Sequence, residues 1–562
     1  MTAPITIVRD AEMPMRDGAV LRGDVWMPDD GRPRPAVLIR TPYGRSGTNN
    51  DFLRPLECVQ GDYACVVQDT RGRAGSGGEW TIFMAGQEAR DTHDSVEWVA
   101  AQPWCDGNVV MAGASYLGIV QLLGAAERPP HLRAIAPGMT GSAELDRAAG
   151  GVIRINEVMA WLAFMAMDWL ERELAAGRPA DPGAAHELWE LATDPAAALR
   201  TLPLKDLPQF AAVPGFPLDV GEMLAYGTPG IAESFAYEAV EVPALSVTGW
   251  FDNYCDSTIE SFLRLRAIHG DRHRLIVGPW SHDGRLGYCQ GEVSFSARGD
   301  ATVLGLSAQH LAFFDEHVRG AQAAAPAVRY FLMGADEWRA ADRWPPPGEL
   351  RTLYLTGDGG LGRRPPEEEH PDHYAYDPDD PVPTRGGRVV NLGRLVPGPL
   401  DRARLEERPD VLCYTSPVLE EPLDVAGPVA VRLFAASSAR DTDFAAKLVD
   451  VFPDGRALAA AGGVQRARHR HGPGTEQLLE PGTVEEYAIG LGHTAWRFPA
   501  GHRVRLEITS SDFPAYDRNM NTGEPVGTDA AGVVAHQTVH HSVLYPSRLE
   551  LPVLSEGLDP LP

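Results

Sequence analysis

The sequence predicts an α/β protein with a helical insertion and a C-terminal all-β part. Three observations lead to this fold class. Short apolar runs alternate with helical stretches in the first third of the chain, almost no strand-like alternation occurs between residues 144 and 235, and short alternating runs with Gly, Pro and Asp turns follow Pro345. Short apolar strands separated by helices indicate a mostly parallel sheet that is covered on both faces. The length of 562 residues also favours more than one domain.

The spacing of apolar residues predicts the position of each strand and helix. The expected sheet strands are residues 20–26, 36–40, 63–68, 109–112, 133–136, 244–247, 274–277 and 328–333, the last being the final strand of the sheet. The expected helices are 88–101, 156–174 and 187–199. Beyond 345–348 (Pro-Pro-Pro-Gly), runs such as 429–434, 444–451 and 504–510 favour two packed antiparallel sheets, and 363–385 is predicted to be a long surface loop. The predicted domains are 1–142 joined with 243–348, the helical insertion 143–242, and 349–562.

Composition narrows the class of protein. The net charge of −27 without a basic block argues against nucleic-acid binding, which needs a concentrated positive surface. The chain lacks the run of about 18 apolar residues that a transmembrane helix needs, and its N-terminus does not resemble a signal peptide. The six cysteines are scattered without a Cys-x-x-Cys pair, so we expect buried apolar thiols in a reducing, cytoplasmic protein.

The most informative stretch is 113–118, Gly-Ala-Ser-Tyr-Leu-Gly, between the expected strand 109–112 and an apolar helix. A serine flanked by small residues at such a junction is typical of a nucleophile elbow in an α/β-hydrolase sheet. The pattern also fits an ordinary tight turn. Leu117 occupies the position where the second glycine of the commoner Gly-x-Ser-x-Gly usually falls.

Two further polar residues follow later strands and complete a candidate catalytic set. Asp252 comes shortly after the strand 244–247, and His282 comes shortly after the strand 274–277. A serine nucleophile needs a base, and that base needs an orienting carboxylate. The chain order Ser115, Asp252, His282 is the order of α/β hydrolases. The weaker alternatives are Asp256, His269, His310 and His317.

An oxyanion intermediate needs hydrogen-bond donors as well. The backbone N–H of Tyr116 is one candidate, since it directly follows Ser115. The second is the phenol of Tyr43, in the loop after the strand 36–40. The alternative for Tyr43 is an aromatic side chain that merely packs in the loop.

Nine stretches resemble the cocaine esterase/X-Pro dipeptidyl-peptidase family of serine hydrolases, also called CocE/NonD hydrolases, over nearly the whole chain. They are 15–18 (Met-Arg-Asp-Gly), 40–44 (Arg-Thr-Pro-Tyr-Gly), 68–72 (Gln-Asp-Thr-Arg-Gly), 104–107 (Trp-Cys-Asp-Gly), 113–118, 249–252 (Gly-Trp-Phe-Asp), 278–282 (Gly-Pro-Trp-Ser-His), 441–444 (Asp-Thr-Asp-Phe) and 510–514 (Ser-Ser-Asp-Phe-Pro). In this family the elbow motif is Gly-x-Ser-Tyr-x-Gly, which explains why the second glycine comes one residue later, at 118.

The resemblance implies an α/β-hydrolase core, an inserted helical cap and a C-terminal jelly roll of the galactose-binding-like kind. It implies Ser115 as nucleophile, His282 as base and then acid, Asp252 as its orienter, and Tyr43 with the Tyr116 amide as the oxyanion hole. The proposed chemistry needs no cofactor, and we expect no metal site.

The family hydrolyses aryl and alkyl esters, α-amino acyl esters and X-Pro peptides. Binding a free α-ammonium group calls for clustered carboxylates, and α-amino ester hydrolases place acids just after the catalytic aspartate. Here Asn253 and Tyr254 stand at those positions, and Asp256 is a poor substitute. We therefore expect a neutral acyl ester as the small-molecule substrate, with Trp161 and Tyr254 as walls of its pocket or as ordinary core residues.

Alternative functions are an X-Pro dipeptidyl-peptidase, an α-amino acid ester or amide acylase, and a catalytically degenerate binding protein. A homodimer through the jelly roll or a sheet edge is one expectation for assembly. The charged turn 68–73 is predicted to be a structural turn with ion pairs and not a phosphate loop, because it lacks the Gly-Lys-Ser/Thr pattern. The strand histidines His536 and His540 are predicted to be structural.

Overall fold

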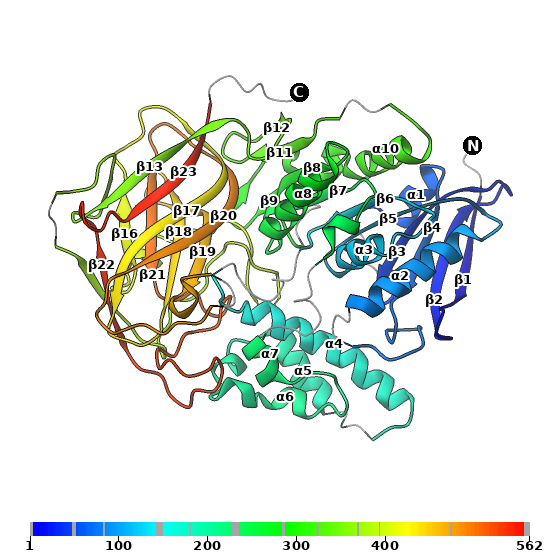
Figure 1. The fold of residues 1–562 in the computed structure, drawn as a ribbon, viewed down its shortest axis with the longest axis horizontal. Coiled ribbons are helices and arrows are strands. Elements are labelled where there is room, and N and C mark those ends of the chain that lie inside the picture. The colour runs from blue at the N-terminus through cyan, green and yellow to red at the C-terminus, as the bar shows by residue number, and fades with distance from the viewer. Residues whose placement is uncertain are drawn as a thin grey trace.

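Figure 1 shows the fold in a computed structural model, with the α/β sheet on one side, the β-rich C-terminal part on the other, and helices α4–α7 below. The structure describes residues 4–47, 52–81, 85–141, 150–179, 181, 183–226, 235–283, 287–322, 325–367, 370–392, 394–472 and 475–555. No helix in these ranges combines the length and the apolar character that a membrane crossing requires.

The α/β part is built on a ten-stranded sheet in the order β1-β2-β4-β3-β5-β6-β7-β8-β11-β12. The strands are β1 (Ile5–Pro14), β2 (Val20–Pro28), β3 (Arg34–Thr41), β4 (Ala64–Asp69), β5 (Cys105–Ala114), β6 (Leu132–Gly138), β7 (Leu245–Phe251), β8 (Arg274–Ser281), β11 (Val328–Leu332) and β12 (Glu337–Ala341). The pairs from β4 through β11 are parallel, whereas β1, β2 and β12 pair antiparallel at the two edges. The carboxyl ends of the central strands therefore meet at one edge of the sheet.

Both faces of this sheet are buried, as the apolar runs predict. On β3, Val37 and Ile39 pack into one apolar cluster and Leu38 packs into a second one on the opposite face. The first cluster includes Phe313 of α10 (Leu306–Val318), and the second includes Val96 of α2 (Ala85–Ala100). Side chains alternate between the faces of a strand, so a strand that is buried on both faces must be apolar at nearly every position.

The remaining helices of the α/β part are α1 (Pro55–Gln60), α3 (Tyr116–Ala126), α8 (Cys255–His269) and α9 (Ala301–Leu304). Between β6 and β7 the chain forms α4 (Ile155–Ala175), α5 (Ala184–Thr193), α6 (Pro208–Ala211) and α7 (Val220–Tyr226). These helices share their own apolar cluster, which includes Met159 and Leu188. Figure 1 shows α4 as the helix of this group that lies next to the α/β part. The predicted start of the insertion, residue 143, lies outside the described residues.

The C-terminal part is an all-β jelly roll, and with the α/β part it confirms the predicted fold class. Its strands are β13 (Gly348–Thr356), β14 (Gly360–Gly362), β15 (Asp372–Tyr376), β16 (Leu412–Thr415), β17 (Leu423–Ser437), β18 (Asp443–Val451), β19 (Ala457–Arg466), β20 (Glu485–Phe498), β21 (Arg503–Thr509), β22 (Ala535–His540) and β23 (Arg548–Leu554). Apart from the β14–β16 bridge, neighbours pair antiparallel. The rings of Phe444 on β18 and Tyr487 on β20 lie 4.6 Å apart inside the roll.

Several predicted elements were wrong. The stretch 363–385 is not only a loop, because it contains β15, whose Tyr374 and Tyr376 are buried. The strand at 328–333 is not the last of the sheet, since β12 follows it at the edge. The helix expected over 187–199 ends at Thr193. Cys289 is exposed, although the other cysteines are buried or half-buried and none of the six forms a disulfide.

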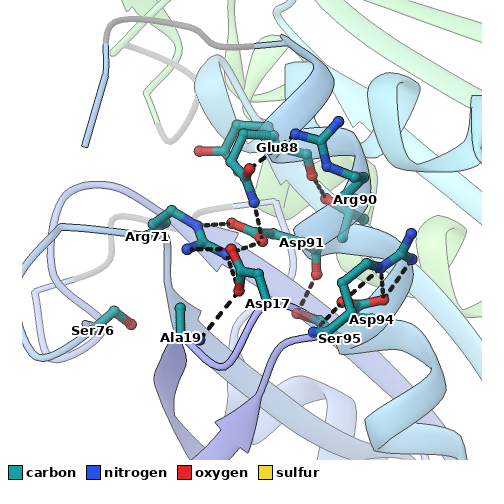
Figure 2. Close-up of polar contacts among 12 residues, drawn as sticks. Asp17, Ala19, Arg71, Ser76, Glu88, Arg90, Asp91, Asp94 and Ser95 are labelled. Atoms are coloured by element: carbon teal, nitrogen blue, oxygen red, sulfur yellow. Dashed lines mark hydrogen bonds and ion pairs between the residues drawn. The ribbon is translucent and has the colours of Figure 1, made fainter. Parts of the chain in front are cut away.

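The charged turn after β4 forms ion pairs, as predicted. Arg71 pairs with Asp91 of α2 at 2.7 Å and with Asp17 of the β1–β2 turn at 3.0 Å. Figure 2 shows the guanidinium of Arg71 lying between these two carboxylates. Asp69 accepts a hydrogen bond from the backbone N–H of Gly75 at 3.1 Å, which closes the turn.

One buried histidine makes stability depend on pH. His310 on α10 is fully buried, its Nδ1 donates to the Leu306 carbonyl at 2.8 Å, and its Nε2 has no hydrogen-bond partner among the described residues. Burial lowers the pKa of His310 to about 4. The unfolded chain, with an imidazole pKa of about 6.5, therefore binds a proton between pH 6.5 and 4 that the folded chain excludes. This contribution to stability is complete above pH 6.5 and is lost as the pH falls towards 4.

We expect His310→Leu to reduce, by about 2 kcal/mol, the loss of unfolding free energy between pH 7 and pH 4.5. Urea titrations at both pH values measure the difference. His186→Leu is the matched control, because its side chain is 76% exposed. An unchanged pH dependence in His310→Leu would contradict this assignment.

Candidate active site

Ser115 lies in a sharp turn between β5 and α3, as the elbow pattern predicts. Its backbone has φ 60° and ψ −127°, a conformation that costs a non-glycine residue about 1–3 kcal/mol. Its N–H donates to the carbonyls of Gly138 at 2.9 Å and Met139 at 3.1 Å, at the end of the neighbouring β6. The strained backbone is therefore held by the adjacent strand, and it places the hydroxyl at the carboxyl edge of the sheet.

Close packing explains why this turn carries glycine at 113 and 118. A Cβ on Gly113 would lie 2.5 Å from the Cβ of Leu117, and the φ of Gly113 is 140°. A Cβ on Gly118 would lie 2.7 Å from the side chain of Thr140. Leu117 packs into the core instead. The second glycine is needed one residue later than in the common elbow because α3 approaches the end of β6 at that position.

Asp252 and His282 form a hydrogen-bonded pair after neighbouring strands. Nδ1 of His282 lies 2.9 Å from Oδ1 of Asp252, and His282 directly follows β8. Asp252 is fully buried, and its carboxylate also accepts hydrogen bonds from the Thr248 hydroxyl at 2.9 Å and the Tyr254 N–H at 3.2 Å. This arrangement fixes the tautomer of the imidazole with Nδ1–H towards the carboxylate, which leaves Nε2 to accept a proton.

Tyr43 lies beside Ser115. Its hydroxyl accepts a hydrogen bond from the indole Nε1–H of Trp161 at 3.2 Å. Desolvation by the surrounding protein raises the pKa of the Tyr43 phenol, although 36% of the residue is exposed, and the nearby Ser115 side chain offsets part of this rise. The phenol therefore remains a hydrogen-bond donor at neutral pH.

A buried network connects the two predicted oxyanion donors. The carboxylate of Glu88 on α2 accepts hydrogen bonds from the Tyr116 hydroxyl at 2.6 Å and from Nη1 of Arg40 at 3.0 Å. Arg40 lies on β3, three residues before Tyr43, and also donates to the Thr92 hydroxyl at 2.5 Å. Burial and the charge of Glu88 raise the pKa of Tyr116. The loop of Tyr43 and the turn of Tyr116 thus depend on one ion pair.

The two predicted pocket residues, Trp161 and Tyr254, both adjoin these groups. Tyr254 packs its ring edge-on against His282, with ring centroids 5.5 Å apart. Sequence reasoning missed Glu157, whose carboxylate accepts a hydrogen bond from Nδ2 of Asn253 at 2.5 Å and whose charge, added to the effect of burial, raises the pKa of the Tyr254 phenol. Burial raises the pKa of Glu157. The available signal was spacing, because Glu157 and Trp161 are four residues apart on one predicted helix.

The structure gives the weaker candidates other roles. Asp256 is in α8, where its carboxylate pairs with Arg388 at 2.9 Å. His269 ends α8, and its Nε2 bonds to the carbonyl of Tyr237 at 2.9 Å. His310 and His317 are on α10. On β22, residues 536, 538 and 540 are exposed or half-buried, whereas 537 and 539 are buried, as the alternation predicts. No group of three potential metal ligands occurs within the described part of the chain.

The fold and the elbow define a serine hydrolase of the α/β class. The X-Pro dipeptidyl-peptidase (S15) family matches residues 17–284, and the X-Pro dipeptidyl-peptidase C-terminal non-catalytic domain matches residues 320–550. The chain is 36% identical to a cocaine esterase of Rhodococcus sp. (strain MB1 Bresler), over 98% of this chain and 99% of the relative.

Solved structures agree in fold. An aminopeptidase from a marine sediment Thaumarchaeota archaeon is 25% identical and superposes with a TM-score of 0.78, over 98% of this chain and 97% of that one. An α-amino acid ester hydrolase is 24% identical with a TM-score of 0.72 over the same shares. The chain belongs to the cocaine esterase/X-Pro dipeptidyl-peptidase (CocE/NonD) family of serine hydrolases.

Replacement of the buried carboxylate tests the network behind Tyr43 and Tyr116. We expect Glu88→Gln to lower the unfolding free energy by about 3 kcal/mol, because it leaves the buried charge of Arg40 uncompensated. Glu97→Gln on the same helix removes the partly exposed partner of His131 and should cost less than about 1 kcal/mol. Denaturant titration measures both. Equal losses in the two variants would refute the role given to Glu88.

Proposed function

We propose that this protein is a serine esterase that cleaves neutral acyl esters through an acyl-enzyme. The Ser115 oxygen attacks the acyl carbonyl while Nε2 of His282 takes the hydroxyl proton, and Asp252 orients the imidazole and stabilises its charge. The oxyanion accepts hydrogen bonds from the Tyr43 hydroxyl and the Tyr116 N–H. His282 then gives its proton to the leaving alcohol. A water molecule, deprotonated by His282, releases the acid and restores Ser115.

One observation carries the proposal: the Tyr43 hydroxyl lies beside the Ser115 side chain at the elbow, close enough for Ser115 to affect the pKa of the phenol. A phenol in that position can donate to the oxygen that becomes negative when Ser115 attacks. The His282–Asp252 contact of 2.9 Å supports the assignment of base and orienter. Contact between Ser115 Oγ and His282 Nε2 is part of the proposal, and we expect a separation of about 3.2 Å or less.

The choice of an ester rests on the residues around His282. Asn253 and Tyr254 follow Asp252, so this turn supplies no acid to hold a substrate ammonium group. The cocaine esterase relative points in the same direction. Trp161 and Tyr254 would supply aromatic walls for the acyl group. We also infer that 143–242 is a cap on a core made of 1–142 and 243–348, with 349–562 as the jelly-roll domain.

A second candidate is an amide or amino-ester hydrolase of the same family. Glu157 favours it, because this half-buried carboxylate lies close enough to His282 for their charges to interact. Such a carboxylate could hold an ammonium group. However, Glu157 already accepts a hydrogen bond from Nδ2 of Asn253 at 2.5 Å. Because the Glu157 carboxylate is already hydrogen-bonded in this way, we expect it to hold the turn after Asp252 and not a substrate ammonium group.

Two substrates separate these functions. We expect the purified protein to hydrolyse p-nitrophenyl butyrate and to act poorly on a glycyl-proline anilide. Ser115→Ala should lower kcat on the ester by at least about 10⁴-fold, since loss of a triad nucleophile removes the covalent pathway. Ser257→Ala is the control for an unrelated hydroxyl near the site. Faster turnover of the anilide than of the ester would replace the esterase proposal with a peptidase. Absence of turnover on both would favour a binding protein.

A further inference from the structure

Helix α4 presents two polar side chains to the hydrolase core, one turn apart. Residues four apart in a helix lie on the same side, so Glu157 and Trp161 face the core together. The N-terminal end of α4 is fixed, because Asn156 donates through its backbone N–H to Pro514 at 3.2 Å and through its amide to the Leu392 carbonyl at 3.0 Å. These contacts tie the start of α4 to the C-terminal all-β part of the chain.

The hydrogen bond with Trp161 determines whether the Tyr43 hydroxyl acts as its donor or its acceptor. An indole N–H can only donate, so the hydrogen bond of 3.2 Å must use a lone pair of the Tyr43 oxygen. The phenolic proton then cannot point at Trp161 and remains available for the Ser115 side or for a substrate oxyanion. The hydrogen bond from Trp161 also opposes the rise that burial causes in the pKa of Tyr43. Both effects make this phenol a better donor.

A second contact ties the same helix to the Tyr43 loop. Nε of Arg73 donates to the carbonyl of Pro42 at 3.1 Å, and Nη2 pairs with Asp168 of α4 at 3.1 Å. The guanidinium also lies over the ring of Trp80, 5.0 Å from its centroid, and Trp80 packs edge-on against Trp161 at 6.4 Å. The indole of Trp161 is thus held from the core side as well as by its own helix.

Glu157 acts on the other half of the site. It accepts a hydrogen bond from Nδ2 of Asn253 at 2.5 Å, and burial together with its nearby charge raises the pKa of the Tyr254 phenol. These two residues follow Asp252 directly, and the ring of Tyr254 lies against His282. The backbone N–H of Tyr254 also donates to Asp252. A carboxylate of α4 therefore holds the turn that carries the orienting aspartate and supports the imidazole.

We propose that Trp161 and Glu157 are positioning residues, through which one turn of α4 completes the oxyanion side and the base side of the active site. The proposal rests on the proposed function. It makes α4 a fixed component of catalysis and not only a wall of the substrate pocket. Loss of either contact should lower kcat with little change in KM, because the contact orients catalytic groups without adding to substrate binding.

A double-mutant cycle tests the Trp161 half. Tyr43→Phe should lower kcat on p-nitrophenyl butyrate by about 100-fold, and Trp161→Phe, which keeps an aromatic ring, should lower it about 5-fold with KM within about 2-fold. In Tyr43→Phe, the added Trp161→Phe should cost nothing, because no hydroxyl remains to be oriented. Trp169→Phe is the control, since its indole donates to Pro214 within the helical insertion.

A matching cycle tests the Glu157 half. Tyr254→Phe keeps the ring that packs on His282 but removes the hydroxyl, and we expect a fall in kcat of about 5-fold. Glu157→Gln should lower kcat more in the wild-type background than in Tyr254→Phe. Glu171→Gln, on the exposed side of the same helix, should leave kcat unchanged.

Additive losses in both cycles, or unchanged kcat in Trp161→Phe and Glu157→Gln, would overturn the proposal for α4. Ser115→Ala distinguishes that failure from failure of the proposed function. If Ser115→Ala abolishes ester turnover while the cycles are additive, the result supports the esterase mechanism and contradicts only the positioning role of Trp161 and Glu157. If Ser115→Ala keeps its activity, both fall.

Discussion

The ion pair between Arg40 and Glu88 is the interaction on which the proposed catalytic edge depends. Both side chains are buried, and removing either partner from a buried pair leaves an uncompensated charge. Arg40 is on β3, which leads into the Tyr43 loop, and Glu88 holds the hydroxyl of Tyr116 at the start of α3. Two loops from separate strands are thereby fixed relative to each other. Preorganised donors of this kind need no reorganisation when negative charge develops.

The same edge is held from outside the core by two more parts of the chain. The jelly roll contributes through Arg388, whose guanidinium donates to the carbonyl of Trp250 at the end of β7, to Asp256 at 2.9 Å, and to the carbonyl of His493 on β20. The helical insertion contributes through α4. Asp252 lies just beyond Trp250, so its position depends on contacts from all three parts. The all-β part thus contacts the end of β7, directly before Asp252.

The central strands could be predicted because a strand that is buried on both faces is apolar at nearly every position, so it appears in the sequence as a continuous apolar run. The residues that follow these strands could then be located from the ends of the runs. Ser115, Asp252 and His282 could be named from their positions after β5, β7 and β8. β1 could not be found in this way, because most of its residues are exposed and its pairing with β2 stabilises it. The partners of Glu157 and Arg388 could not be assigned, since a charged residue gives no local sign of a partner 96 or 105 residues away, even where its helical spacing from Trp161 places Glu157 on the same face.

The central claim is that Ser115 is the activated nucleophile of this preassembled edge. The most direct measurement is peptide mass spectrometry after reaction of the protein with a fluorophosphonate, which phosphonylates an activated serine and releases fluoride. The account predicts a single adduct on Ser115 and a loss of ester turnover in proportion to labelling. An adduct on a different residue that accompanies the loss of activity, or full ester turnover after Ser115 is modified, would contradict it.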